Sequence, residues 1–211
     1  MTEEKKEEAV ESKTDYRTGF LKKVEDTKVF ESGNKVKNAL LLSGTKEEPK
    51  WTQVNAWNAM ADVLENAQSG ERWELKGKVT MEADKNDPSK QYENINVEEA
   101  HQYTKEKIVG KIQSIETGKT KNDTDMTKIF VIAEQSAGGS KTTEPYNIEL
   151  YGKDTKKAVD FKKGQMIEVD DWAKNFSYKK EEEVKVSKTF RNPRSMDIVG
   201  KSKKQGAAMS V

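Results

Sequence analysis

The run WTQVNAW at residues 51–57 spaces large aromatic rings at the period of a β-strand. Since successive strand residues point to opposite faces, Val54 and Ala56 share one face, which predicts a modest core contact. The opposite face carries two indoles and two amides, namely Trp51, Gln53, Asn55 and Trp57. Indoles that project from a sheet can stack on unpaired bases, at roughly 1 to 3 kcal/mol per base, and amides can hydrogen-bond bases or phosphates. The alternative is that both indoles cap a small core or pack under a loop.

A second run, WAKNFSYKK at residues 172–180, interleaves aromatic and basic residues. The period of two places four of them on one strand face: Trp172, Lys174, Phe176 and Tyr178. Rings can take bases while ammoniums, including that of Lys179, take phosphates. We favour Phe176 and Tyr178 for binding and Trp172 for the core. The alternative is a long hairpin whose aromatic residues cover the end of a small barrel.

Four further positions are candidates for the same kind of site. Lys119 and Lys121 lie in a polar loop where phosphates could run, although a solvated loop explains them equally well. Phe130 lies in the run IFVI, which is apolar on both faces, so either Phe130 or its neighbours must face outward. Tyr92 alternates with the apolar residues of its strand, which points its ring away from the core.

The sequence does not predict catalysis. The chain has no cysteine and a single histidine, His101, which excludes thiolate chemistry and histidine-rich metal sites. The aspartate pairs considered as metal ligands are Asp84 with Asp87 in a turn and Asp170 with Asp171 in a strand, where neighbours point to opposite faces. A magnesium site needs carboxylates that converge from several elements. Neither a phosphate-binding glycine loop nor a nucleophile elbow occurs. We therefore expect no catalytic residues, no metal and no cofactor.

The composition limits the architecture. Hydrophobic residues make up 33% and charged residues 36% of the 211 residues, which fits small barrels with thin cores better than a thick layered enzyme. The formal net charge is +1, so any site for a polyanion must come from local segregation of charge. The N-terminus lacks an apolar signal region, and no apolar run approaches the roughly 18 residues that span a membrane. We expect a cytoplasmic protein without a membrane partner.

The elements that position these residues follow from periodicity. After residue 57, apolar residues at i, i+3, i+4 and i+7 predict a helix with one buried stripe, formed by Met60, Val63, Leu64 and Ala67. Gly70 ends this connection, and residues 72–79 and 92–97 resume the alternation of strands. An earlier strand offers Phe20 and Val24 as core positions.

The second half of the chain repeats this order of elements. Residues 146–151 superpose on residues 52–57 at a constant offset of 94, at which Gly164 meets Gly70. A repeat of roughly 90 residues is too long for a solenoid unit and indicates duplicated domains. We expect two domains, at residues 16–97 and 107–200, joined by a linker at residues 98–106. A disordered tail at residues 1–15 precedes them, and a flexible basic tail at residues 201–211 follows them. Five strands with a helix between the third and the fourth is the element order of the OB-fold, so the expected fold class is all-β, with two tandem barrels.

On these residues the chain resembles the bacterial single-stranded DNA-binding proteins. Their motif of Trp, two residues, Val and an apolar-aromatic pair leads into a helix and a glycine turn, as at residues 51–57 and Gly70 here. The second half keeps the family's aromatic-Gly-Lys junction at residues 151–153. The resemblance implies base stacking by both tryptophans of the first motif and by Tyr151.

The chain departs from the family in two ways. The bacterial proteins usually have one barrel per chain and assemble as tetramers, whereas this chain carries two, as some phage and mobile-element versions do. They also end in an acidic tip that recruits partners, but residues 201–211 here contain three lysines and no side-chain acid. The resemblance implies largely sequence-independent binding of single-stranded DNA in replication or recombination, in the host cytoplasm if the protein is phage-encoded, with an oligomer and protein partners left open. RNA is an alternative ligand, since stacking does not read the 2′-hydroxyl.

A different class of function stays open on the sequence alone. The near-neutral charge also fits a tandem-OB scaffold whose exposed rings bind another protein of a replication or virion complex. The first hypothesis predicts that unpaired DNA quenches tryptophan fluorescence and that affinity falls steeply with added salt. The second predicts a protein complex that forms without any oligonucleotide.

Overall fold

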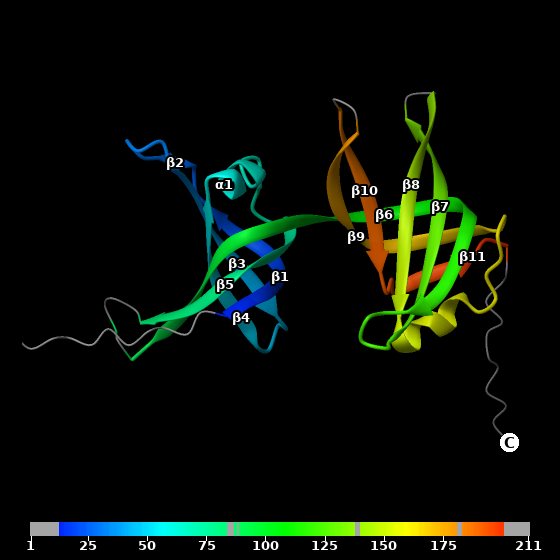
Figure 1. Cartoon of the computed structure of the whole chain (residues 1–211), viewed down its shortest axis with the longest axis horizontal. Helices are drawn as coiled ribbons and strands as arrows, with labels where there is room; N and C mark the ends of the chain where they lie inside the picture. Colours follow the sequence, from blue (N-terminus) through cyan, green and yellow to red (C-terminus); the bar gives the residue numbers. More distant parts are fainter. Residues whose placement is uncertain (1–12, 84–86, 88, 138–139, 181–182, 201–211) are drawn as a thin grey trace, which may run out of the picture. The chain divides into compact units, whose positions relative to one another are not determined.

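The computed structural model describes residues 13–83, 87, 89–137, 140–180 and 183–200. Most of this part of the chain lies in β-strands (Figure 1). The chain forms two compact units, which divide between Tyr103 and Thr104 inside one strand, β6 (Gln91–Lys119). Each unit therefore takes part of its sheet from the same strand.

The strands of the first unit pair into a closed ring. Its elements are β1 (Lys13–Val24), β2 (Lys28–Val29), β3 (Lys35–Gly44), β4 (Pro49–Trp57), α1 (Ala59–Val63), β5 (Arg72–Ala83) and the first part of β6. β1 pairs antiparallel with β3 and β5, β3 with β4, and β5 with β6, whereas β4 and β6 run parallel. The ring order β1-β3-β4-β6-β5, with one short helix between β4 and β5, is that of the OB-fold.

Inward-pointing side chains of all the main strands fill this ring. Leu21, Leu41, Val54, Leu75 and Ile95 each come from a different strand and are fully buried. Burial of a side chain of this size stabilises the folded state by about 1.5 to 3 kcal/mol. Only every second residue of a strand faces inward, so a chain with 33% hydrophobic residues can close such a core.

A β-bulge in β1 changes which of its side chains face outward. Between Leu21 and Lys23 the pairing with β3 slips by one residue, and an extra residue reverses the alternation beyond it. Phe20, before the bulge, is 36% exposed, whereas Val24, after it, packs against the core. The sequence prediction is therefore wrong for Phe20, because residues 20 and 24 share a face only in an unbroken strand.

The second unit repeats the same ring order. Its elements are the second part of β6, β7 (Asp125–Ala137), β8 (Ser140–Tyr151), the 3₁₀ helix η1 (Gly152–Ala158), β9 (Met166–Lys180), β10 (Glu183–Arg191) and β11 (Ser195–Ile198). β7 pairs antiparallel with β6 and β8, and β9 with β10, whereas β8 and β10 run parallel. A further pairing of β9 with β6 closes the ring.

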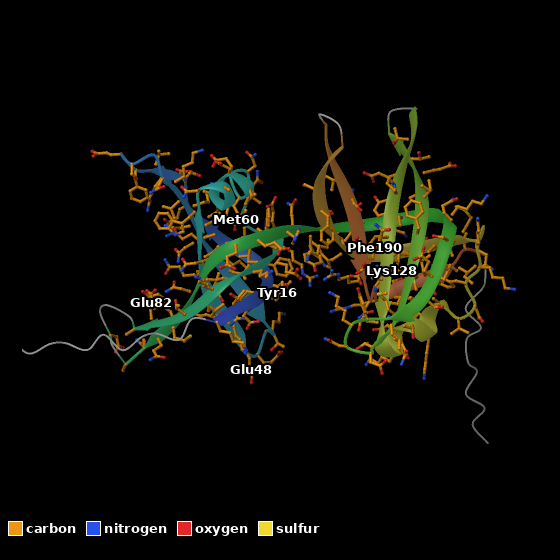
Figure 2. The ribbon with its side chains drawn as sticks, viewed as in Figure 1. Tyr16, Glu48, Met60, Glu82, Lys128 and Phe190 are labelled. Carbon is orange, nitrogen blue, oxygen red and sulfur yellow. The ribbon has the colours of Figure 1, made fainter. Side chains whose placement is uncertain are left out.

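Two aromatic residues form the centre of the second core. Tyr146 and Phe190 are fully buried and stack with ring centroids 5.7 Å apart. Phe190, labelled in Figure 2, comes from β10, and Tyr146 comes from the parallel strand β8. The buried hydroxyl of Tyr146 donates to Glu144 at 2.6 Å, so this core carries no cost for an unpaired phenol.

The all-β fold class and the OB strand order agree with the sequence prediction, but the connection after the third strand of each ring is shorter than expected. In the first unit it is the five-residue helix α1, and in the second the 3₁₀ helix η1. Met60, Leu64 and Ala67 pack against the core as predicted, whereas Val63 is 48% exposed. Since α1 ends at Val63, Leu64 and Ala67 reach the core from the segment that follows the helix, and the helical spacing that predicted a buried Val63 does not hold there.

Two predicted boundaries also differ from the structure. Residues 98–106, expected to be a linker, belong to β6, and Glu99 to Tyr103 pair with β5. Residues 13–15, expected in a disordered tail, pair with residues 77–79 of β5. Charged side chains on both faces hide these strand ends, since alternation of polar and apolar residues is the signal for a strand. The remainder of both expected tails lies outside the described residues.

Candidate nucleic-acid interface

β4 presents alternate residues to the inside and the outside of the first ring. Thr52, Val54 and Ala56 point inward and are buried. The outward residues are those that the alternation predicts: Trp51, Gln53, Asn55 and Trp57. The side chains of Trp51 and Trp57 remain 48% and 46% exposed. Both indoles are therefore accessible to a ligand, and neither is a core residue.

A row of apolar and aromatic side chains crosses three strands at Trp51. Phe20 of β1 opposes Leu42 of β3, which in turn opposes Trp51 of β4. Directly opposed side chains of antiparallel strands lie about 4.5 to 5.5 Å apart, so the three form one continuous surface, which we call the aromatic row. The Lys22 ammonium lies 5.9 Å from the centroid of the Phe20 ring. Sequence reasoning missed Phe20 and Leu42 here, because only the pairing register reveals that they flank Trp51.

Amide side chains form the next rows on the same outward side of β3 and β4. Leu40 opposes Gln53, and Asn38 opposes Asn55. Within the part of the chain that the structure describes, the side-chain amides of Asn38, Gln53 and Asn55 hydrogen-bond no other residue. Their donors and acceptors therefore remain available to water or to a ligand.

Trp57, at the other end of β4, is already stacked on a neighbour. Its ring and that of Phe30 lie 5.9 Å apart, with an angle of 19° between the planes. Phe30 is itself 47% exposed, and Val36, opposite Trp57, is buried. One face of the Trp57 ring is therefore occupied, which leaves the other face for a base.

A groove of about 620 Å³ lies beside Trp51. Its lining includes Trp51, Lys50 and Tyr92. Thr52 pairs with Glu93 in the parallel ladder between β4 and β6, so the preceding residues, Trp51 and Tyr92, lie side by side. Tyr92 is half-buried and faces this groove, which agrees with the predicted outward direction of its ring.

An ion pair lines the same groove. Arg17 donates from Nε and Nη2 to the two carboxylate oxygens of Glu93, at 2.7 and 2.6 Å, and Thr52 Oγ1 donates to Glu93 at 2.6 Å. The hydrogen bonds from Arg17, and then from Thr52, hold the pKa of Glu93 below its usual value. The bonds to Glu93 likewise raise the pKa of Arg17. Because its charge is compensated, Arg17 is a poor phosphate ligand, and the exposed Lys50 is the better one.

In the second unit Phe130 points outward from β7. It is 37% exposed, and its neighbours Ile129 and Val131 are buried, so the face of this apolar run that carries Phe130 and the half-buried Ile132 points outward. It opposes Asn147 of β8. Pro145 stands two residues before Asn147, where the repeat places Trp51 two residues before Gln53. The second unit therefore lacks an indole at the position of Trp51.

Tyr151 contacts an acid on the same strand. Its hydroxyl donates to Glu149 at 2.7 Å, and Glu149 also accepts from Arg191 Nε at 3.3 Å. Burial, and then the hydrogen bond to Glu149, raises the pKa of Tyr151 above its usual value. Glu149 takes the place of Asn55 in the repeat. Its negative charge opposes binding of a polyanion beside Tyr151.

The two predicted lysines of the loop between β6 and β7 differ in their surroundings. Lys119 pairs with Asp123 at 2.8 Å, and both side chains are exposed. Lys121 is also exposed. An exposed ion pair contributes little stability, so Lys119 can exchange Asp123 for a phosphate at small cost.

The hairpin of β9 and β10 brings Lys174 and Phe176 together. The Lys174 ammonium lies 4.9 Å from the Phe176 ring centroid, since residues two apart share a strand face. Lys174, however, is only 4% exposed. This differs from the exposed lysine that the sequence predicts, because the alternation fixes the face of a side chain but not what covers that face.

The other predicted residues of this hairpin are Trp172, Tyr178 and Lys179. Trp172 is half-buried and does not belong to the core cluster, contrary to the prediction that it is a core residue, because its position alternates with the buried Ala173. Tyr178 and Lys179 lie in β9, where they oppose Lys185 and Val184. Their side chains lie outside the described residues, so their binding role stays a prediction.

The described part of the chain offers no candidate for a metal site or for a membrane-spanning helix. Among the residues that the structure describes, no group of three or more His, Cys, Asp or Glu residues could hold a metal ion. No helix in that part of the chain has the length and apolarity needed to cross a membrane.

The strand pairing defines an all-β protein of the OB-fold class. No family model matches the sequence, and no curated protein matches it. Among solved structures, the single-stranded DNA binding protein from Thermus aquaticus is similar over 92% of this chain and 96% of its own, with 10% identity and a TM-score of 0.35. The mitochondrial single-stranded DNA binding protein from S. cerevisiae matches over 46% of this chain and 94% of its own, with 19% identity and a TM-score of 0.34. At these TM-scores the fold assignment rests on the strand pairing of this chain alone.

Proposed function

We propose that the chain is a non-catalytic, largely sequence-independent single-stranded DNA-binding protein. The observation that carries this proposal is the aromatic row, in which Phe20 and Leu42 extend the half-exposed indole of Trp51 across three strands. Contiguous apolar surface on the outside of a soluble domain usually marks a binding site. Unpaired bases are flat and apolar on their faces, so they match this surface.

In the proposed mechanism, bases stack on rings while lysines neutralise phosphates. Trp51, with Tyr92 beside it, provides one stacking position, and the free face of Trp57 provides another at the far end of β4. The exposed Lys22 and Lys50 lie next to the aromatic row. Bases in a duplex hide their faces in the stack, so this surface favours single strands. Stacking does not distinguish DNA from RNA, and RNA is the alternative ligand.

Stacking does not depend on which base is present, so it is suited to proteins that coat single-stranded DNA of any sequence. We therefore propose a role in DNA replication or recombination in the cytoplasm, or in the host cytoplasm for a phage-encoded chain. Contacts with other replication or recombination proteins, and self-association, belong to this proposal.

A salt titration of oligo(dT) binding, followed by tryptophan fluorescence, tests the function. We expect quenching on binding and an affinity that falls linearly in log–log form with salt. Trp51→Ala should weaken binding by about tenfold or more, since a stacked base contributes roughly 1 to 3 kcal/mol. Tyr16→Ala is the matched control, because Tyr16 is a 55% exposed ring of the same unit that packs beside Lys76 of β5. Equal affinity for duplex and single strands, or an equal effect of both variants, would refute the proposal.

A second candidate function rests on a separate apolar cluster. Val29 and Phe30 are 66% and 47% exposed, and Phe30 stacks on the exposed Trp57. Such a cluster also fits a tandem-OB scaffold that binds a protein of a replication or virion complex. That function predicts a stoichiometric protein complex that forms without oligonucleotide, survives Trp51→Ala and is lost with Phe30→Ala.

A further inference from the structure

The bulge in β1 places a carboxylate on the same side of the sheet as the aromatic row. Beyond the bulge, Lys23 opposes Leu40, and the backbone N–H of Glu25 donates to the carbonyl of Asn38 at 2.9 Å. Without the extra residue, Val24 would face outward and Glu25 inward. The bulge thus puts an acid, which repels DNA phosphates, in the middle of a surface with exposed indoles.

A hollow of about 190 Å³ lies at this acid. It is lined by residues of β1, β3 and β4 and by the residue that follows β1: Lys23, Glu25, Asn38, Ala39, Leu40 and Gln53. Leu40 and Gln53 form the row next to Leu42 and Trp51. Residues two apart on a strand are separated by about 6.6 Å, so the hollow directly adjoins the aromatic row. A base that stacks at Trp51, or its neighbour in the strand, can therefore present its edge here.

The polar groups of this hollow favour one kind of base edge. The ionised carboxylate of Glu25 only accepts hydrogen bonds. Its Oε1 lies 3.0 Å from the Lys23 ammonium and its Oε2 lies 3.4 Å from the Lys28 ammonium, and both lysine side chains are largely exposed. The lysines therefore orient the carboxylate and offset part of its charge, while their other donors remain available to phosphates. The uncommitted amides of Asn38 and Gln53 can adapt to either edge, since each has a donor and an acceptor.

We propose that Glu25 makes the first unit prefer cytosine over thymine within its otherwise sequence-independent binding. The two pyrimidines have similar size but differ at position 4, where cytosine carries an amino donor and thymine a carbonyl acceptor. The Glu25 carboxylate accepts from the amino group and repels the carbonyl oxygen, and carboxylates are known partners of the cytosine amino group. This inference rests on the proposed function, because it requires that bases reach the outward side of β3 and β4.

The test compares oligo(dC) and oligo(dT) of equal length at one salt concentration and at a pH above neutrality, with affinity measured by tryptophan fluorescence. The wild type should bind oligo(dC) about fivefold or more tightly, a modest value for one base-reading contact. Glu25→Gln should abolish this ratio, both by weakening oligo(dC) binding and by strengthening oligo(dT) binding, since the variant lacks the repelling charge. Glu47→Gln is the matched control. It removes one acidic charge from the turn between β3 and β4, outside the hollow, and should keep the ratio.

The outcomes separate this inference from the proposed function. Equal affinities of the wild type for both oligonucleotides, or a preference that survives Glu25→Gln, overturns the role of Glu25 while binding itself stands. If Lys23 were the dominant donor, the wild type would prefer oligo(dT), and that result also overturns the inference. Failure to bind either oligonucleotide refutes the proposed function instead. Circular dichroism of each variant confirms that the fold is retained.

Discussion

Glu93 and Lys188 occupy equivalent positions in the two units but carry opposite charges. Glu93 opposes Thr52 in the parallel ladder of the first ring, and Lys188 opposes Tyr146 in that of the second. Each makes an ion pair inside its own unit: Glu93 with Arg17 at 2.6 Å, and Lys188 with Glu106 at 3.0 Å. In each unit the hydroxyl of the β4 or β8 residue also bonds the acid of the pair. Both rings therefore have an ion pair, with a hydroxyl bonded to its acid, at the equivalent position of the parallel ladder. The residue at that position is the acid in the first ring and the base in the second.

We expect Glu93→Gln to destabilise the first unit by about 2 kcal/mol, the usual size for loss of a hydrogen-bonded charge in a partly buried site. The substitution removes the charge of the carboxylate to which Arg17 donates twice and leaves that guanidinium with Asp15 as its remaining carboxylate. Urea unfolding followed by tryptophan fluorescence measures the effect. The control is Glu99→Gln, on the same strand, whose carboxylate is 48% exposed and pairs with Lys76 and His101; because this carboxylate is exposed, its loss should cost less than about 1 kcal/mol. Equal stability of the two variants would contradict the role of the Arg17 pair.

The same carboxylate predicts a loss of stability in acid. The pKa of Glu93 in the folded chain lies below its ordinary value of 4.5, chiefly because Arg17 donates to it. The unfolded chain therefore takes up the proton first as the pH falls. The contribution of Glu93 is fully present above the ordinary value and is lost as the pH falls through the lower, folded-state pKa. Unfolding free energies measured over this range should fall less steeply for Glu93→Gln than for the wild type. Identical slopes would contradict the assignment.

Much of the fold could be predicted from the sequence, because the alternation of residues 51–57 and the repeat at an offset of 94 reflect local periodicity and duplication. The bulge between Leu21 and Lys23 could not. Nothing in the sequence of β1 distinguishes a strand that slips by one residue from one that does not, since the slip is decided by the pairing with β3. Because this slip lies between residues 20 and 24, the two side chains face opposite sides of the strand, and the prediction that both face the core is wrong for Phe20.

The candidate site, like the fold, could be predicted only where it depends on the periodicity of a single strand. The outward direction of Trp51 follows from its own strand, but its neighbours Phe20 and Leu42 depend on register between strands. The low exposure of Lys174 and the contact of Tyr151 with Glu149 depend on what lies across or above the strand. The two-residue alternation can be read from one strand alone, whereas these contacts depend on which residue of another strand or loop lies next to the side chain.

The two exposed indoles of β4 should contribute unequally to binding. Trp51 lies in the open aromatic row, whereas one face of Trp57 is covered by Phe30. A base that stacks on the covered face of Trp57 must first displace Phe30, whereas Trp51 lines a groove that a base can enter. We expect Trp51→Ala to weaken oligo(dT) binding by about tenfold or more and Trp57→Ala by less than about fivefold. Anisotropy of a labelled oligonucleotide at fixed salt measures both, and an equal or larger loss with Trp57→Ala would contradict this ranking.

Removal of the acid beside Tyr151 should strengthen DNA binding by the second unit. Glu149→Gln keeps an acceptor for the Tyr151 hydroxyl, removes a charge that repels phosphates, and frees Arg191 from its bond at 3.3 Å. One added cation–phosphate contact steepens the plot of log affinity against log salt by about 0.7 for a single strand. Glu168→Gln is the matched control, because it frees Lys107 on the β6 and β9 side of the same unit, away from β7 and β8. An unchanged slope for Glu149→Gln, or an equal change in the control, would show that Tyr151 and Arg191 lie off the path of the bound strand.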